Sequence, residues 1–411
     1  MNVAHSRQSI AHLLGMFTPF IVALILLGTL LSLFAPPNTR ADLPLSAQLT
    51  NKKRQPASSS SIPSLFPSQI NAFVSLQRQN YVQLLKVTTL NGTNLHPDPD
   101  WVSDDLDRSV YTAWGDVDGD GDLDLAVANS NLFYGEPGTR IYLNDKGTLQ
   151  TNAIWTANYE DENRYLDWGD MDGDGDLDLA VANIDRSDSN PSPNRIYRND
   201  GLSTDLDGNL ILLLEEAWVD PQPDYDTGAV AWGDYNGDGR LDLAVGNGGW
   251  TTAEPSFVYR NDGLDGNQNI ILTPVFTTPI DSLTTAIAWG DMDNDGLLDL
   301  ALGNLNQPNR VYENVLGTFI YGGPFGWESA TGLDSTYTIQ WGDINLDGYL
   351  DLAVGNLYDE NQIFLNNSGT LNATAAWTDT LDSPTIRISL GDVDNDGDLD
   401  LAVANVVVAG S

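Results

Sequence analysis

One pattern of apolar and polar positions recurs six times in the last three quarters of the chain. Its first copy reads WGDVDGDGDLDLAVAN, and its opening acidic residues are followed each time by a short apolar run. The six copies occupy residues 114–129, 168–183, 232–247, 289–304, 341–356 and 390–405. The first aspartates of successive copies lie 54, 64, 57, 52 and 49 residues apart. A fixed motif at unequal steps indicates one repeated structural unit with loops of varying length.

Each of the first five copies is followed by a second, shorter pattern. An apolar and aromatic segment that ends in Asn comes first, and an isolated aromatic residue follows it. These segments are residues 140–144, 195–199, 257–261, 310–314 and 362–366, and the aromatic residues are Trp155, Trp218, Phe276, Trp327 and Trp377. Short β-branched and aromatic runs between Gly, Asn and Asp are typical of strands and turns. We therefore expect four strands per unit: A ends at Trp-Gly, B is Leu-Asp-Leu-Ala-Val, C is Arg-Ile-Tyr, and D ends at the aromatic residue.

Repeated four-stranded units of about 50 residues predict an all-β protein, and specifically a β-propeller. The sixth copy stops after its strand B, in residues 399–408, and has no strands C and D. Residues 80–85 and the run that leads to Trp101 resemble a C and D pair without an A and B pair. We expect six four-stranded blades, the last of them completed by these N-terminal strands, because closure removes the open sheet edges. The alternative is a truncated propeller that once had a seventh blade.

The N-terminal part of the chain differs in composition from the repeats. In residues 1–41, Arg7 precedes an apolar run at residues 20–35, as in a signal peptide for export. The apolar stretch with its flanks is also long enough to span a bilayer, so an uncleaved signal anchor is the alternative. Residues 42–70 are rich in Ser and Pro and predict a flexible linker, which leaves residues 71–411 for the propeller.

The acidity of the chain excludes several classes of protein. It has 58 acidic and 18 basic residues and a formal net charge of −40, and the first hundred residues contain only three of the acidic residues, Asp42, Asp98 and Asp100. A surface this negative repels nucleic acids and anionic headgroups, so the sole membrane contact we expect is the N-terminal anchor. Cysteine is absent, which excludes disulfides and thiolate metal sites.

The acidic residues are concentrated in the turn between strands A and B. In the first copy Asp116, Asp118, Asp120 and Asp124 occupy positions 1, 3, 5 and 9 of this turn, and Gly121 occupies position 6. Ca²⁺ takes about six to eight oxygen ligands, which alternate residues of a tight loop supply, and Gly permits the sharp reversal of the chain. The equivalent residues in the other copies are Asp170, Asp172, Asp174 and Asp178; Asp234, Asn236, Asp238 and Asp242; Asp291, Asp293, Asp295 and Asp299; Asp343, Asn345, Asp347 and Asp351; and Asp392, Asp394, Asp396 and Asp400.

A comparison among the copies indicates which atoms the loop needs. Positions 1, 5 and 9 are always Asp, whereas position 3 is Asp or Asn, so an oxygen is required there but a charge is not. Position 7 includes Arg240, Leu297 and Tyr349, so a ligand from this position is its backbone carbonyl. Position 12 is Val127 in the first copy, where an EF-hand needs Glu. Close carboxylates repel by about 4 kcal/mol per pair at 4 Å near a surface. We therefore predict about six Ca²⁺ ions with a structural role.

These loops carry a family resemblance. The pattern D-x-[DN]-x-D-G-x-x-D, in a repeat that ends LDLAVGN, resembles the FG-GAP or VCBS repeat, which forms the blades of integrin α-subunit propellers. The resemblance covers about residues 75–408, with Trp-Gly where the family often has Phe-Gly. It implies a calcium-stabilised extracellular propeller that serves in adhesion or recognition.

The leading functional prediction is a secreted or surface-anchored binding module, without enzymatic activity, for a protein or carbohydrate partner. A calcium-dependent polysaccharide-degrading enzyme and a purely structural envelope component are the alternatives. After export, His96 is the sole histidine, so an acid–base mechanism needs carboxylates outside the loops, such as Asp161 or Glu162.

Other recurring residues have simpler interpretations. The tryptophans of the Trp-Gly pairs are expected to pack between adjacent blades rather than to stack on carbohydrate. The arginines at the start of strand C are expected to neutralise nearby carboxylates. The B–C loops lie at the end of the ring opposite the A–B turns, and the longest are residues 130–139, 184–194 and 248–256. We expect a partner to dock over these three loops.

Overall fold

The computed structural model describes an all-β chain. It covers the backbone of residues 83–84 and residues 101–405, except 106, 131–137, 160, 185–191, 223–224, 249–251, 323–324, 331–333, 381–383 and 395. This described part contains strands and no helix, and therefore no helix that is long and apolar enough to cross a membrane. The predictions for residues 1–70 and His96, and for much of the three long B–C loops, fall outside it.

Five antiparallel sheets follow one another along the chain, each in the strand order A, B, C, D. The first contains β3 (Ser109–Gly115), β4 (Asp124–Asn129), β5 (Gly138–Tyr142) and β8 (Trp155–Thr156), with a small hairpin of β6 (Asn144–Asp145) and β7 (Thr148–Leu149). The second contains β9 (Asn163–Gly169), β10 (Asp178–Asn183), β11 (Arg195–Thr204) and β12 (Leu210–Val219). The third contains β13 (Thr227–Gly233), β14 (Asp242–Asn247), β15 (Phe257–Leu264) and β16 (Ile270–Thr277).

The remaining sheets have the same design. The fourth contains β17 (Thr284–Gly290), β18 (Asp299–Asn304), β19 (Arg310–Val315), β20 (Thr318–Ile320) and β21 (Trp327–Glu328). The fifth contains β22 (Thr336–Gly342), β23 (Asp351–Asn356), β24 (Gln362–Phe364) and β25 (Trp377–Thr378). Two pairs stand apart: β26 (Thr385–Gly391) with β27 (Asp400–Asn405), and β1 (Gln83–Leu84) with β2 (Trp101–Val102).

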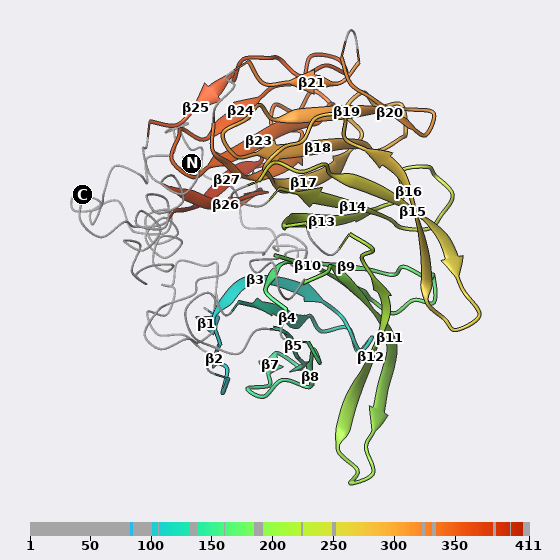
Figure 1. The fold of residues 1–411 in the computed structure, drawn as a ribbon. Helices are drawn as coiled ribbons and strands as arrows, with labels where there is room; N and C mark the ends of the chain where they lie inside the picture. The colour runs from blue at the N-terminus through green and yellow to red at the C-terminus, as the bar shows by residue number, and fades with distance from the viewer. Residues whose placement is uncertain are drawn as a thin grey trace, which may run out of the picture.

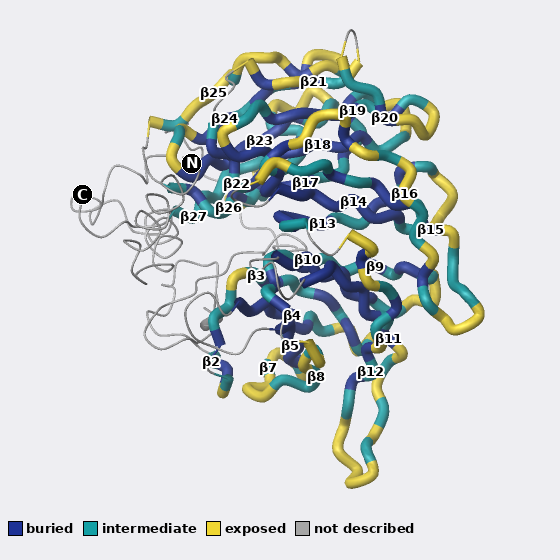
Figure 2. Tube along the Cα trace, viewed as in Figure 1, coloured by how far each residue is buried: buried dark blue, intermediate teal, exposed yellow. Residues whose placement is uncertain are grey.

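The sheets are arranged as the blades of a propeller (Figure 1). Strand β3 packs beside β9, β9 beside β13, β13 beside β17, β17 beside β22, and β22 beside β26, so the A strands form the inner series. The B strands are the most buried elements, and every residue of β4, β10, β14, β18 and β23 is buried. Figure 2 shows this burial near the centre, with exposed residues at the outer loops and at the tip of the β11–β12 hairpin.

The strand predictions are confirmed in most respects. Each A strand ends at the Gly of its Trp-Gly pair or, in the last copy, at Gly391, and each B strand begins at the aspartate at position 9. The prediction that D ends at the aromatic residue is wrong. In β8, β21 and β25 the tryptophan begins the strand, and the strand continues for one more residue. In the first blade, for example, Trp155 pairs with Ile141, and the next residue, Thr156, pairs with Arg140.

The Trp-Gly pairs join neighbouring blades, as the sequence predicted. A Cβ atom on Gly115 would lie 2.9 Å from Cδ1 of Trp168, which belongs to the next blade. The same relation, at 2.6–2.7 Å, holds for Gly169 with Trp232, Gly233 with Trp289, Gly290 with Trp341, and Gly342 with Leu390. Glycine at these positions therefore permits the close approach of each ring to the preceding blade.

A second contact joins the outer strands of neighbouring blades. The D-strand aromatic ring of one blade meets the C-strand ring of the next blade edge to face, a favourable aromatic geometry. The pairs are Trp155–Tyr197, Trp218–Tyr259, Phe276–Tyr312 and Trp327–Phe364, with centroids 4.8–5.4 Å apart. Trp101 of β2 makes the same contact with Tyr142 of the first blade, at 5.3 Å.

The arginines at the start of strand C neutralise carboxylates, as expected. Arg140 pairs with Asp107, Arg195 with Asp161, and Arg310 with Glu328. These arginine side chains are 8–12% exposed, so the pairs lie at the sheet rather than in solvent.

The sixth unit is incomplete within the described residues. Among the described strands, β27 pairs with β26 alone, and its residues are partly exposed, unlike those of the other B strands. A Cβ atom on Gly391 would meet no described atom within 4 Å. The described chain is therefore a propeller with five complete blades and a sixth two-stranded unit, and the predicted sixth complete blade is not established by it.

Candidate metal centres

The six acidic turns between strands A and B have nearly the same backbone. We name them loop 1 to loop 6: residues 116–124, 170–178, 234–242, 291–299, 343–351 and 392–400. Position 6 is Gly in every loop, with φ between +87° and +103°. Position 4 also has positive φ in loops 1 to 5, where Asn294 and Leu346 replace Gly. Two left-handed residues fold the turn back on itself, which explains why glycine dominates these positions.

The aspartate at position 1 closes each turn. Its Oδ2 atom accepts a hydrogen bond from the backbone N–H of the glycine at position 6, at 2.8–3.1 Å in all six loops. The carboxylate at position 5 accepts a bond from the N–H of position 7 in the same way, as Asp120 does from Asp122. The carboxylates are therefore drawn to the inside of the turn.

The aspartate at position 9 is the buried member of each set. In loop 1 both oxygens of Asp124 accept backbone hydrogen bonds, from Val117 at 2.9 Å and from Asn144 at 2.8 Å. Asp124 is fully buried, and burial raises its pKa to about 6. Burial likewise raises the pKa of Asp242 to about 6 and of Asp178 and Asp299 to about 7. A nearby cation would favour the charged form that burial disfavours.

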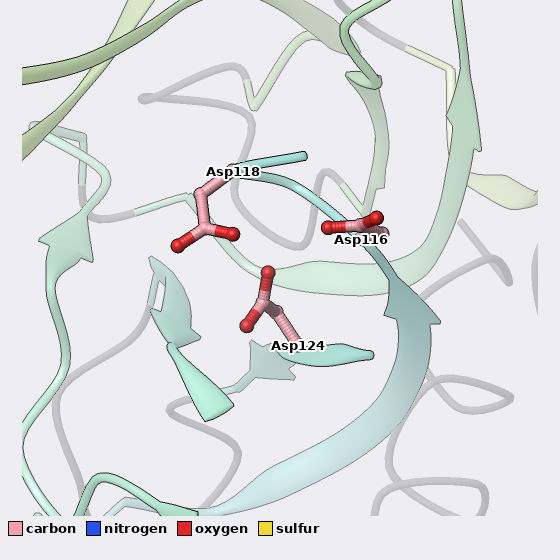
Figure 3. A group of neighbouring side chains, drawn as sticks. All are labelled: Asp116, Asp118 and Asp124. Atoms are coloured by element: carbon pink, nitrogen blue, oxygen red, sulfur yellow. The ribbon is translucent and has the colours of Figure 1, made fainter. Parts of the chain in front are cut away.

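Among the described residues, carboxylates converge in four of the six loops. In loop 1, one oxygen from each of Asp116, Asp118 and Asp124 lies within 4.8 Å of the other two, and Figure 3 shows the three side chains turned toward one another. The corresponding groups in the other loops are Asp170, Asp172 and Asp178; Asp291, Asp293 and Asp295; and Asp392, Asp394 and Asp400.

The other predicted ligands are placed differently. Asp120, Asp174 and Asp396 at position 5 and Asp299 at position 9 lie in their loops but outside these groups of three. Loops 3 and 5 carry Asn at position 3, and the amide group donates a hydrogen bond to a carboxylate: Asn236 to Asp242 at 3.2 Å, and Asn345 to Asp347 at 3.0 Å. The predicted residues Asp234, Asp238, Asp343 and Asp351 complete these two loops.

One unsatisfied atom tests whether a cation fits. Oδ1 of Asp116 is buried and has no hydrogen-bond partner among the described residues. Such an atom is costly unless it has a ligand. The donor set around it consists of carboxylate oxygens, which are the ligands that Ca²⁺ prefers. The residues of loop 1 therefore fit a hard divalent cation.

An asparagine recurs in all five complete blades at the end of the segments 140–144, 195–199, 257–261, 310–314 and 362–366, and the sequence alone predicted no role for it. Its backbone N–H donates to the aspartate at position 9, and its side chain donates to the carbonyl of position 8. In the second blade the same amide of Asn199 also donates to the carbonyl of Val117 in loop 1, at 2.8 Å. Asn261, Asn314 and Asn366 repeat this bond to Met171, Tyr235 and Met292. These asparagines connect each loop to the loop of the preceding blade.

The carboxylates considered for acid–base chemistry lie elsewhere. Asp161 is buried, and its carboxylate accepts a hydrogen bond from Nε of Arg195 at 2.5 Å. Burial raises the pKa of Asp161, and the Arg195 contact lowers it. Asp161 is thus one half of an ion pair that joins β11 to the segment before β9.

The opposite end of the blades has its own repeated bond. The asparagine that ends each complete strand B from the second blade onward donates to a carbonyl of the B–C loop, as Asn183 does to Pro193. Its side-chain oxygen accepts from the first residue of strand A, as Asn247 does from Thr227. These buried bonds fix the base of each B–C loop.

The fold and the acidic loops together define a repeat protein of the propeller class, and the family comparison agrees. Residues 116–181, 170–245, 291–354 and 343–403 match the family described as FG-GAP-like repeat. Each match begins at position 1 of one loop and ends in the next strand B, so all six loops lie inside matched residues. The chain belongs to the FG-GAP-like repeat family.

Two individual proteins resemble the chain more distantly. Cartilage acidic protein 1 of Xenopus tropicalis is 26% identical over 318 residues, which cover 70% of this chain and 46% of that protein. The chain therefore spans about half the length of this curated relative. A second similar protein is found in the crystal structure of BBS1N in complex with ARL6DN, soaked with lead. Its matched chain shares 13% sequence identity with this chain and has a TM-score of 0.42, and the match covers 72% of this chain and 74% of that chain.

Proposed function

We propose that this chain is an exported binding module whose propeller is stabilised by calcium and serves a protein or carbohydrate partner. The observation that carries the proposal is the set of acidic loops, with the buried, unpartnered oxygen of Asp116 at its centre. Family membership supports the same function. Each loop ends at the first residue of a B strand, which ties the loop to the core, so that ions there would act on folding rather than on a substrate.

Calcium would contribute a large share of the stability. Extracellular calcium modules bind with dissociation constants of about 10⁻⁴ to 10⁻³ M. At ten times this concentration each site adds about 1.4 kcal/mol and six sites about 8 kcal/mol, against a usual total of about 5–15 kcal/mol. Thermal unfolding in 5–10 mM Ca²⁺ and in EDTA tests this: we expect a melting temperature lower by roughly 10 °C or more in EDTA. An unchanged melting temperature would contradict the structural role.

We further propose that β1–β2 and β26–β27 form one blade, which makes six. Leu84 pairs with Trp101 as Ile141 pairs with Trp155, so β1–β2 has the register of a C–D pair. Trp101 also contacts Tyr142 as the D-strand ring of a preceding blade would. The pair β26–β27 has the register of an A–B pair beside the fifth blade. A closed ring requires β26–β27 and β1–β2 to be the two halves of one blade. Pairing of β27 with β1 would then cover the free edge of β27.

Gly391 provides a test of this closure. In a closed ring Trp114 would lie against Gly391 as Trp168 lies against Gly115. We expect Gly391→Ala to lower the melting temperature as much as Gly342→Ala does, whose Cβ would lie 2.7 Å from Leu390. A harmless Gly391→Ala beside a destabilising Gly342→Ala would contradict closure, because the site would then be open.

We place the partner over the B–C loops of the first three blades, at the end opposite the acidic loops. Asn183 and Asn247 fix the base of the second and third of these loops, which supports a fixed position for the ends of both loops. Export through residues 1–41, and a linker at residues 42–70, would present this face outside the cell. We expect a glycan array and a pull-down from extracellular material to yield a ligand in calcium and to lose it in EDTA.

The binding experiments also distinguish the binding module from the two alternative functions, a polysaccharide-degrading enzyme and a structural envelope component. Release of reducing or unsaturated ends from a bound polysaccharide would favour the degrading enzyme. Absence of any ligand with intact calcium-dependent stability would favour a purely structural component.

A further inference from the structure

Loop 3 differs from the other five loops in charge. Position 7 is Arg240 in this loop, whereas it is Asp, Leu or Tyr elsewhere. Over positions 1 to 9 the formal charge is −5 in loops 1, 2 and 6, −4 in loop 4, −3 in loop 5, and −2 in loop 3. Loop 3 therefore has the weakest electrostatic attraction for a divalent cation and already contains a cation of its own.

The Arg240 side chain lies against the predicted ligands. Its Nη2 atom is 2.6 Å from Oδ2 of Asp238, and its Nε donates to the carbonyl of Asn261 in β15 at 2.8 Å. The backbone N–H of Arg240 donates to Oδ1 of the same aspartate at 3.0 Å. Both oxygens of Asp238, the expected ligand at position 5, are thus engaged by one residue.

The other carboxylates of loop 3 also have partners within the chain. Asp234 accepts backbone hydrogen bonds from Asp238 and Gly239. Asp242 accepts one bond from the side chain of Asn236 at 3.2 Å and one from the backbone of Asn261 at 2.8 Å. Loop 1 presents the contrasting case, since Oδ1 of Asp116 is buried without a partner among the described residues.

Loop 5 isolates the contribution of the arginine. It also has Asn at position 3, and Asn345 donates to Asp347 at 3.0 Å. Its position 7 is Tyr349, which brings no charge. The guanidinium between Asp238 and strand β15 is therefore the charged group by which loop 3 differs from loop 5.

We propose that Arg240 is the resident cation of loop 3, so that this loop is ordered without calcium and binds calcium most weakly of the six. The inference rests on the proposed calcium function of the other loops. A guanidinium at hydrogen-bond distance from a carboxylate is a strong, directional partner. A divalent ion entering loop 3 must displace this contact and is repelled by the arginine as well.

Calcium titration of the full chain, followed by calorimetry and native mass spectrometry, tests the proposal. Arg240→Leu places the residue of loop 4 in loop 3, and Arg260→Leu is the matched control. Arg260 pairs at 2.8 Å with exposed Asp262, outside the loops, and its loss changes the net charge equally. We expect Arg240→Leu to raise the affinity of one weak site by about tenfold or more, and Arg260→Leu to change no site by more than about twofold.

Hydrogen exchange of the wild-type protein gives a second measurement that does not depend on a variant. The amides of Gly239 and Arg240 donate within loop 3, and those of Gly121 and Asp122 donate within loop 1. In EDTA we expect the loop 3 amides to exchange at nearly their rate in calcium and the loop 1 amides to exchange about tenfold faster or more.

The outcomes are distinguishable. Equal responses of Arg240→Leu and Arg260→Leu, or equal loss of protection in loops 1 and 3, would overturn this inference and leave the calcium function standing. A wild-type protein that binds no calcium in the millimolar range would overturn the calcium function and this inference together.

Discussion

The buried aspartate at position 9 combines two tasks that usually fall to different residues. Its oxygens accept the backbone N–H groups that join the turn to strands B and C, and its charge contributes to the converging carboxylates. Burial opposes that charge and raises the pKa of Asp178 to about 7, and a cation bound beside it would favour the charged form that burial disfavours.

Loop 2 allows positions 9 and 7 to be compared with the same substitution. Asp178 is fully buried and accepts hydrogen bonds from Met171 and Asn199, both at 2.8 Å, whereas Asp176 at position 7 is only half-buried. We expect Asp178→Asn in calcium to lower the free energy of unfolding by about 1–3 kcal/mol, since an amide N–H₂ would face a backbone donor. Asp176→Asn should lower it by less than about 0.5 kcal/mol. Urea unfolding checks this, and equal effects would argue against the assigned roles.

Asp167, which lies outside the loops, is expected to make the stability of the protein depend on pH. Burial raises its pKa to about 7, while the backbone N–H of Trp232 and the charge of Arg387 lower it. The folded state therefore binds a proton more tightly than the unfolded chain, and this stabilisation is lost as the pH rises from about 4 through 7.

Asn at position 167 keeps an acceptor for Trp232 and removes the charge. Between pH 5 and pH 8 we expect the free energy of unfolding of Asp167→Asn to rise by more than about 1 kcal/mol relative to that of the wild type, as measured by urea unfolding in saturating calcium. A difference between the two proteins that stays constant across this range would refute the buried-charge account.

At the scale of the strand and the turn, the sequence was informative wherever one short segment determines the geometry. Position 6 has positive φ and position 9 begins strand B, so a local motif predicted the turn and two of the four strands. Contacts between segments far apart were not accessible in this way. The bond from Asn199 to the carbonyl of Val117 joins residues 82 positions apart, and the orientation of Arg240 depends on the strand that carries Asn261.

The bounds of strand D show the same limit. The sequence marked its aromatic residue correctly but placed the end of the strand there. Each D strand also pairs through the residue after its aromatic residue, as Thr156 does with Arg140. This register is set by strand C and by the hairpin that joins strands C and D. A single-strand pattern contains no information on that hairpin.

The contact between blades gives a prediction for one glycine. A Cβ atom on Gly233 would lie 2.6 Å from Cδ1 of Trp289, closer than packed carbon atoms approach. We expect Gly233→Ala to lower the free energy of unfolding by about 1–3 kcal/mol, because the ring must move. Gly266→Ala is the control, since a Cβ there meets no described atom within 4 Å and its φ is not positive. Chemical denaturation of both variants checks this, and a tolerated Gly233→Ala would mean that the blades are not packed through the Trp-Gly pairs.

At the scale of the whole molecule, the charge is distributed unevenly along the series of blades. Loops 6, 1 and 2 each have a formal charge of −5 and are carried by β26–β27 and by the first two blades. These are the units on either side of the open end of the described blades. Mutual repulsion without cations would therefore act most strongly where the proposed ring must close.

This distribution predicts how salt acts on the protein. In EDTA we expect the melting temperature to rise by several degrees between about 20 mM and 500 mM NaCl, because salt screens the repulsion among carboxylates. In saturating calcium the same change should have less than half the effect, since bound cations have neutralised the loops. Differential scanning calorimetry checks both, and an equal rise in both conditions would indicate a general salt effect unrelated to the loops.

A crystal structure of the full chain grown in millimolar Ca²⁺ tests the central claim most directly. The account predicts spherical density in loops 1, 2, 4, 5 and 6, with oxygen ligands at about 2.3–2.6 Å from positions 1, 3, 5 and 9 and from the carbonyl of position 7, and weak or absent density in loop 3. Loops that retain the carboxylate arrangement but contain no cation at that concentration would contradict it.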